Sequence, residues 1–162
     1  MIVVSNTTPL IGLATIGRFD LLRHVFAEVY IPQAVYDEAV IAGREEGGAR
    51  REVSSAEWIT MVPVKDRSAV DLLLDELDLG EAETIILAQE LRADWVLMDE
   101  RKGRRKLAQL GINKIGTLGI LLKAKQMGLL AEVRPELESL RQQGFSISQA
   151  VIEAILNSAR EI

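Results

Sequence analysis

The chain of 162 residues contains no cysteine and one histidine, which excludes several kinds of active site. Without cysteine there is no disulfide, no thiolate metal site and no cysteine nucleophile, and this fits a reducing compartment. The single histidine, His24, lies outside the motifs described below and offers them no general base. Aromatic residues make up only 4% of the chain, which argues against a protein that binds single-stranded nucleic acid mainly by base stacking.

Long apolar runs and glycine-rich phosphate loops are also missing. No apolar stretch approaches the roughly 18 residues that suggest a membrane span, and the N-terminal residues lack the basic leader and cleavage site of a signal peptide. The GxxxxGK[ST] loop and the GxGxxG turn are absent, which weakens the alternative of a nucleotide-binding or phosphoryl-transfer domain. We therefore expect a cytoplasmic protein that does not enter a membrane.

Short apolar runs alternate with helical patterns along the chain. With 48% hydrophobic residues and no linker or internal repeat, we expect a single domain over residues 1–162, with C-terminal helices from about residue 132 packed on it. The alternation predicts an α/β fold rather than a helical bundle. The predicted strands cover residues 2–5, 28–31, 59–64, 95–98 and 114–116.

Helices are predicted between and after these strands. Thr7 or Thr8 is expected to cap a helix that has a proline in its first turn, and Pro32 is expected to open the helix that carries Glu38. Residues 43–55 are interpreted as a loop or a frayed helix. Further helices are predicted over residues 71–77, 81–91, 101–110, 118–126, 134–142 and 148–160, with Asp78 and Gly80 as breakers and Ser148 as a cap.

Acidic residues recur where predicted strands end and helices begin. They are Glu38, the pair Glu81 and Glu83, and the pair Asp99 and Glu100, while Asn6 holds the equivalent position after the first strand. Ligands of open α/β sheets bind at the carboxyl ends of the strands, and Mg²⁺ and Mn²⁺ prefer oxygen donors. The layout therefore predicts a site for a hard divalent cation.

Each acid also has an explanation that involves no function. Glu81 and Glu83 lie in the first turn of a predicted helix, where a carboxylate interacts favourably with the helix dipole. Glu38 fits a solvated helix residue equally well. Asp99 is the strongest functional candidate, because a carboxylate directly after four apolar strand residues is expected at the edge of the core.

A basic run follows the last acidic pair. Residues 101–106, RKGRRK, carry five cationic side chains although the formal net charge of the chain is −5. Cations beside a metal site suit a polyanion such as RNA, because they hold the phosphates that flank the reacting one. We interpret Arg101, Lys102, Arg104 and Arg105 as RNA phosphate contacts, and the alternative is an ordinary solvated helix face.

Four stretches in register carry a resemblance to a known family. They are VVSNTTPLIGLATIGRFDLL, YIPQAVYDEAV, LDLGEAETIILAQEL and WVLMDERKGRRKLAQLGINKIGTLGILLKAK, and together they resemble PIN-like domains of short prokaryotic proteins over nearly the whole chain. The resemblance implies a three-layer α/β/α fold with a central, mostly parallel sheet of about four to five strands. It also implies a Mg²⁺- or Mn²⁺-dependent ribonuclease with one or two ions that cleaves single-stranded RNA. Such proteins are often toxins paired with a small DNA-binding antitoxin, and often homodimers.

The resemblance assigns the site residue by residue. It places the catalytic and metal-binding positions at Asn6, Glu38, Glu83 and Asp99, with Glu81 and Glu100 as assisting residues. Asn6 departs from the family pattern, because its amide oxygen can coordinate a cation but brings no negative charge. Three outcomes stay open: an active nuclease, a slow one, or a catalytically inactive module that binds RNA or a partner protein through apolar helices such as residues 118–130 or 151–156.

Overall fold

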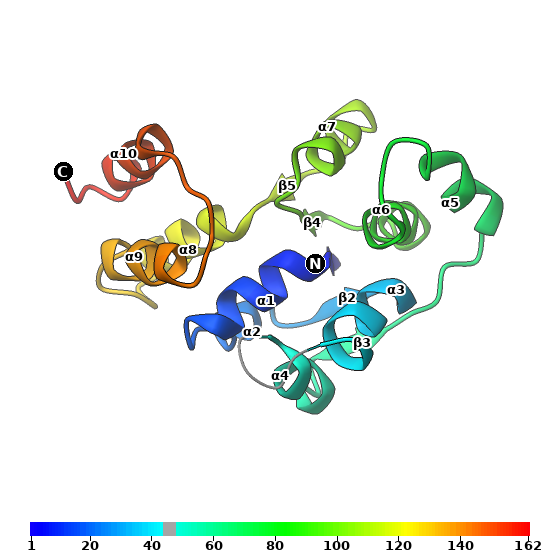
Figure 1. The fold of residues 1–162 in the computed structure, drawn as a ribbon, viewed down its shortest axis with the longest axis horizontal. Coiled ribbons are helices and arrows are strands. Elements are labelled where there is room, and N and C mark those ends of the chain that lie inside the picture. Colours follow the sequence, from blue (N-terminus) through cyan, green and yellow to red (C-terminus); the bar gives the residue numbers. More distant parts are fainter. Residues whose placement is uncertain (44–47) are drawn as a thin grey trace.

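The computed structural model describes residues 1–43 and 48–162 and has a parallel sheet at its centre (Figure 1). The strands are β1 (Val3–Ser5), β2 (Val29–Ile31), β3 (Ile59–Met61), β4 (Trp95–Leu97) and β5 (Lys114–Ile115), in the order β3-β2-β1-β4-β5. Every neighbouring pair is parallel. The five predicted strands are therefore confirmed, with β1 in the middle of the sheet.

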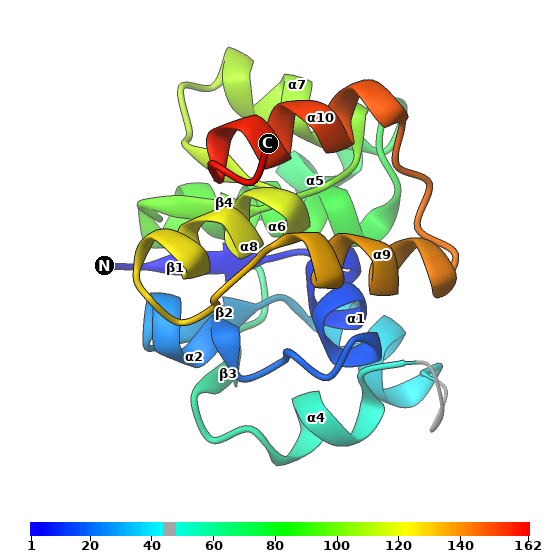
Figure 2. The ribbon, with the colours of Figure 1, turned by 90° about the vertical axis from the view of Figure 1, so that its left-hand side faces the viewer.

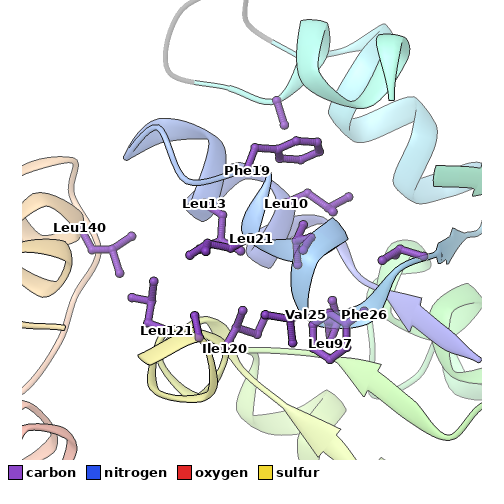
Figure 3. Close-up of a cluster of buried hydrophobic side chains, with 14 of the residues drawn as sticks. Leu10, Leu13, Phe19, Leu21, Val25, Phe26, Leu97, Ile120, Leu121 and Leu140 are labelled. Carbon is purple, nitrogen blue, oxygen red and sulfur yellow. The ribbon is translucent and has the colours of Figure 1, made fainter. Parts of the chain in front are cut away.

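The central strands β1 and β4 are buried on both faces of the sheet, since successive side chains of a strand point to opposite sides and both sides are covered. Val3 and Leu97 belong to one apolar cluster, whereas Val4 and Val96 belong to a second. Figure 3 shows part of the first cluster, in which Leu97 lies near Val25, Phe26 and Ile120. This double burial explains why the strands are short apolar runs without polar alternation.

Helices cover the two faces and complete the predicted three-layer α/β/α fold (Figures 1 and 2). Helices α1 (Thr7–Thr15), α2 (Leu21–Phe26) and α8 (Thr117–Gln126) contribute to the first cluster, together with α9 (Arg134–Gln142) and α10 (Gln149–Ser158). Helices α5 (Arg67–Leu73), α6 (Leu79–Leu91) and α7 (Arg101–Gln109) contribute to the second. The remaining elements are α3 (Gln33–Tyr36), the π-helical turn η1 (Asp37–Ile41) and α4 (Arg50–Ser55).

The prediction that Thr7 or Thr8 caps the first helix is wrong. Helix α1 begins at Thr7, and Asn6, with an extended backbone, is the residue before it. No side chain caps this end, because the hydroxyls of Thr7 and Thr8 are hydrogen-bonded to carboxylates of other segments. By contrast, the predicted cap of α10 is confirmed, since Ser148 Oγ accepts the Val151 amide hydrogen at 3.2 Å.

Two helices begin earlier than predicted because aspartates cap them. Asp66 accepts the amide of Ala69 at 3.0 Å, so α5 covers Arg67–Leu73 rather than residues 71–77. Asp78 and Glu81 form a reciprocal capping box, so α6 starts at Leu79, and Asp78 and Gly80 begin the helix instead of breaking it.

The segment predicted as a loop or frayed helix contains helix α4, and its residues 44–47 lie outside the described part of the chain. Across residues 1–43 and 48–162, no helix has both the length and the apolar character needed to cross a membrane.

Candidate active site

The strand order reverses between β1 and β4, and polar residues meet at this point. Chain segments leave the carboxyl ends of the two strands in opposite directions, which is where open α/β sheets form a ligand crevice. Asn6 follows β1 and is buried, with 4% of its surface exposed. Its Nδ2 donates to Glu100 Oε2 at 3.0 Å and lies 3.4 Å from Met98 Sδ. The structure thus brings Asn6 and Glu100 together across the crevice.

The first turn of α1 holds two carboxylates. Thr7 Oγ1 donates to Glu38 Oε2 at 2.8 Å, and Thr8 Oγ1 donates to Glu100 Oε1. Glu38 comes from the π-helical turn η1, and such turns are rare in proteins and often found at functional sites. Residues 6–8 therefore supply one amide and two hydroxyls that orient Glu38 of η1 and Glu100, which lies just before α7.

Gly80 lets Glu38 reach this crevice. A Cβ added to Gly80 would collide with Glu38 Oε1 and would lie 3.2 Å from Glu38 Cδ. The carboxylate of Glu38 therefore rests directly on the first turn of α6, a position that only glycine leaves open.

Helix α6 brings one acid, Glu81, to this region. The residue is buried, and its Oε1 accepts the Asp78 amide hydrogen at 3.0 Å while its own amide donates to Asp78 Oδ1 at 2.8 Å. Burial raises the pKa of Glu81, and the charges of Asp78 and Glu100 raise it further. Glu81 is thus close enough to Glu100 for the two carboxylates to repel each other.

Glu38 experiences the same repulsion. Partial burial of its carboxyl group raises the pKa of Glu38, whereas the hydrogen bond from Thr7 lowers it. The charges of Asp78, Glu100 and Glu83 raise this pKa further. A nearby positive charge would relieve the repulsion by favouring the ionised carboxylates.

These groups fit a hard cation by donor chemistry, because all are carboxylate, amide or hydroxyl oxygens. Within residues 1–43 and 48–162, however, no three acidic or histidine side chains are already arranged as ligands of one ion.

Glu83, which the sequence assigns to the metal, has both carboxylate oxygens engaged elsewhere. Its Oε1 accepts the Ala34 amide hydrogen at 2.9 Å, and its Oε2 accepts from Arg67 Nη1 at 2.7 Å. Only 3% of Glu83 is exposed. The structure therefore places this side chain in a buried ion pair rather than beside Asn6.

Asp99 is tied to the start of α8. Its Oδ1 accepts the Thr117 amide hydrogen at 2.8 Å, and its Oδ2 accepts from Thr117 Oγ1 at 2.6 Å. Burial raises the pKa of Asp99, while these two hydrogen bonds and the charge of Arg104 lower it. An acid at a helix N-terminus is stabilised by the unpaired amides and the helix dipole, so this arrangement has a structural explanation of its own.

The basic helix α7 divides into an inner and an outer part. Arg104 points inward and donates to the Met98 carbonyl oxygen at 2.9 Å, whereas Arg101, Lys102 and Arg105 are exposed. A groove of about 320 Å³ is lined by Lys102, Arg105, Lys106 and Gln109 on one side and by Asp75 and Glu76 on the other. Lys106 pairs with Glu76 at 3.2 Å, so Lys102 and Arg105 are the groove cations open to an anion.

The sequence did not identify the roles of Thr7, Thr8, Asp78 and Gly80. The signal for the capping box was present in DLGE, an N-cap aspartate followed three residues later by glutamate. No local signal indicated that the two threonines would hold carboxylates 31 and 92 residues away in sequence.

A five-stranded parallel sheet with polar side chains gathered at its switch point defines an open α/β domain. A family model described as a PIN domain matches residues 2–161, and the chain therefore belongs to the PIN domain family. Members of this family are generally nucleases that act on RNA and typically use divalent metal ions. No curated protein matches the chain.

Proposed function

We propose that the protein is a metal-dependent endoribonuclease that hydrolyses phosphodiester bonds in single-stranded RNA. The observation that carries this proposal is the meeting of Asn6, Glu38 and Glu100 at the switch point of the sheet, with Glu81 next to them. Two threonine hydroxyls fix Glu38 and Glu100 at this point. Such preorganisation is typical of an active site rather than of a solvated helix face.

The proposed cofactor is Mg²⁺ or Mn²⁺, as one or two ions. Glu38, Glu100 and the amide oxygen of Asn6 would hold it, with Glu81 assisting. Glu83 and Asp99 stay predicted ligands, but each would have to exchange a present partner for the ion. Such an ion supplies polarisation of the phosphate and lowers the pKa of a water molecule, which makes a histidine base unnecessary.

RNA would bind along the exposed face of α7. Arg101, Lys102 and Arg105 are exposed there, and the last two line the groove described above. Replacing Lys102 and Arg105 together by alanine should weaken RNA binding and reduce the dependence of log K on log[salt] by about 0.7 per lost phosphate contact. Arg104→Ala should instead lower the melting temperature, because its guanidinium holds the Met98 carbonyl. Equal effects of both changes on RNA affinity would contradict this division of α7.

Cleavage of labelled single-stranded RNA tests the proposal directly. Activity should require Mg²⁺ or Mn²⁺, disappear with a chelator, and fall at least about 100-fold in Glu100→Gln, a magnitude typical of lost electrostatic stabilisation. Glu138→Gln, which changes an exposed residue of α9, is the matched control and should cleave like the wild type. Cleavage without metal, or full activity of Glu100→Gln, would remove the proposal.

A second candidate function is a catalytically weakened or inactive PIN domain that binds RNA or a partner protein. It is favoured by the neutral Asn6 in the crevice and by the engagement of Glu83 and Asp99 with other groups. This candidate predicts RNA binding without Mg²⁺-dependent cleavage. The RNA assay above therefore separates the two functions.

We further propose that the protein is the toxin of a toxin–antitoxin pair, active as a homodimer and restrained by a small DNA-binding antitoxin. Its induced expression should stop growth of a bacterial host, and Glu100→Gln should not. Growth arrest by both forms, at equal protein levels, would contradict a toxic ribonuclease.

A further inference from the structure

A buried ion pair borders the candidate active site. Arg67, the first residue of α5, keeps 53% of its side chain exposed, yet its Nη1 donates at 2.7 Å to Glu83, whose side chain is only 4% exposed. The other oxygen of Glu83 accepts the Ala34 amide hydrogen at 2.9 Å. Two elements, α3 and α5, therefore fix the carboxylate, and the carboxylate in turn fixes the guanidinium.

The pair is close to the acidic residues of the crevice. Glu83 lies on α6, the same helix whose first turn supports Glu38, and its charge is near enough to act on the Glu38 carboxyl. The contact with Glu83 is the one hydrogen bond that the Arg67 guanidinium makes to the described residues. A guanidinium has five N–H donors, so its exposed edge retains donors for an anion.

An acidic crevice that acts on RNA needs cations beside it, because its carboxylates repel the phosphates of the substrate. We propose that Arg67 binds a phosphate of the RNA strand next to the scissile bond and that Glu83 is the residue that positions it. The inference rests on the proposed ribonuclease function. An arginine held by a buried carboxylate loses little freedom when it binds, and its planar fork matches a phosphate group.

A pair of double variants tests this proposal. R67Q combined with E83Q removes one positive and one negative charge, so the formal net charge stays at −5 and no lone charge is left buried. R18Q combined with E136Q is the matched control. Arg18, with 45% of its side chain exposed, pairs at 2.8 Å with Glu136, whose side chain is 9% exposed, and this pair lies beyond the other end of α1 from Asn6.

The readouts are the affinity for a labelled single-stranded RNA in EDTA, its salt dependence, and KM and kcat with Mg²⁺. The R67Q/E83Q protein should bind RNA about three- to fivefold more weakly than the wild type and lose about 0.7 from the slope of log K against log[salt]. Its KM with Mg²⁺ should rise by a similar factor or more. Because kcat also depends on whether Glu83 reaches the ion, the RNA affinity in EDTA, where no ion is bound, decides the role of Arg67. The control should match the wild type in each measurement.

The possible failures are distinguishable. Equal RNA affinities for the two double variants, with a wild type that binds and cleaves RNA, would overturn the role of Arg67 and leave the ribonuclease proposal intact. A wild type that neither binds nor cleaves RNA would overturn both. If R67Q alone bound Mg²⁺ more tightly without any change in RNA affinity, Arg67 would be a competitor of the ion, and the phosphate contact would be refuted.

Discussion

A methyl group added at Gly80 should separate activity from stability. In Gly80→Ala the new Cβ collides with Glu38 Oε1, so the carboxylate must leave the first turn of α6 and give up its hydrogen bond with Thr7. Glu38 is exposed and has room to turn toward solvent. The substitution therefore displaces one group of the candidate site without opening a cavity in the core.

The two effects differ in size. Displacing a catalytic group by about 1 Å costs about 100-fold in rate, which corresponds to about 2.7 kcal/mol at 1.36 kcal/mol per tenfold. Stability should change by less than about 1 kcal/mol. Alanine gains up to about 1 kcal/mol over glycine in a helix, and the lost Thr7–Glu38 hydrogen bond costs about 0.5–1.5 kcal/mol.

RNA cleavage with Mg²⁺ and thermal unfolding measure the two quantities. Gly119→Ala is the matched control, because it adds the same methyl to the first turn of α8, where it meets the Ile115 side chain instead of a carboxylate. We expect a loss of about 100-fold in kcat/KM for Gly80→Ala and a change of less than about twofold for the control. Unchanged cleavage by Gly80→Ala would refute the position of Glu38 in the active site.

Three further substitutions test the surrounding residues. Asp99→Asn should lower the free energy of unfolding in urea by about 1 kcal/mol, because the hydrogen bonds that Asp99 accepts from Thr117 at the start of α8 are weakened. An unchanged free energy of unfolding would contradict this structural role of Asp99. Asn6→Asp should destabilise the metal-free protein, since it places a second carboxylate against Glu100. It should also enlarge the rise in melting temperature that Mg²⁺ causes. An unchanged rise in melting temperature with Mg²⁺ would show that residue 6 does not contact the ion. Burial and neighbouring charges raise the pKa of Glu38, so the folded protein loses stability as the pH rises through that pKa. Glu38→Gln should therefore have a higher melting temperature than the wild type at pH 7, and the difference should vanish in acid, where the wild-type carboxyl is protonated. A difference in melting temperature that does not change with pH would contradict this coupling.

The fold was predictable because the central strands of this sheet are buried on both faces. Residues 2–5 and 95–98 are apolar runs that no amphipathic helix would produce, and both became central strands. Helix starts were less predictable where a cap was misinterpreted. The sequence pattern predicts Asp78 to be a breaker, but its side chain accepts the Glu81 amide hydrogen, so Asp78 caps α6 and the helix begins at Leu79.

The candidate site was predictable as a region but not residue by residue. Glu81 and Glu83 are two positions apart on one helix, about 200° around its axis, so they point in different directions. The sequence alone does not show whether Glu81 or Glu83 faces the switch point of the sheet. The folded chain engages the two acids differently, because Arg67 and the Ala34 amide hold Glu83, whereas Glu81 closes the capping box with Asp78.

Adjacent residues Asp99 and Glu100 present the same ambiguity at the end of β4. Asp99 is directed to Thr117 on the α8 side, and Glu100 to Asn6 and Thr8. The resemblance to PIN domains placed Asp99 at the metal because it is the first acid after the strand. The hydrogen bonds favour Glu100 instead, because it contacts Asn6 and Thr8. Measuring RNA cleavage and the free energy of unfolding for Glu100→Gln and Asp99→Asn decides between the two residues.

The amide at Asn6 gives the crevice a property that four acids would lack. As a hydrogen-bond donor, Asn6 Nδ2 compensates part of the Glu100 charge without an ion, whereas an aspartate would add to the repulsion that already raises the pKa of Glu38 and Glu81. The same side chain carries an oxygen that can face a cation after rotation of the amide. Asn6 therefore stabilises the metal-free protein and would reduce the electrostatic attraction for an ion, so half-maximal activity should require a higher Mg²⁺ concentration in the wild type than in Asn6→Asp.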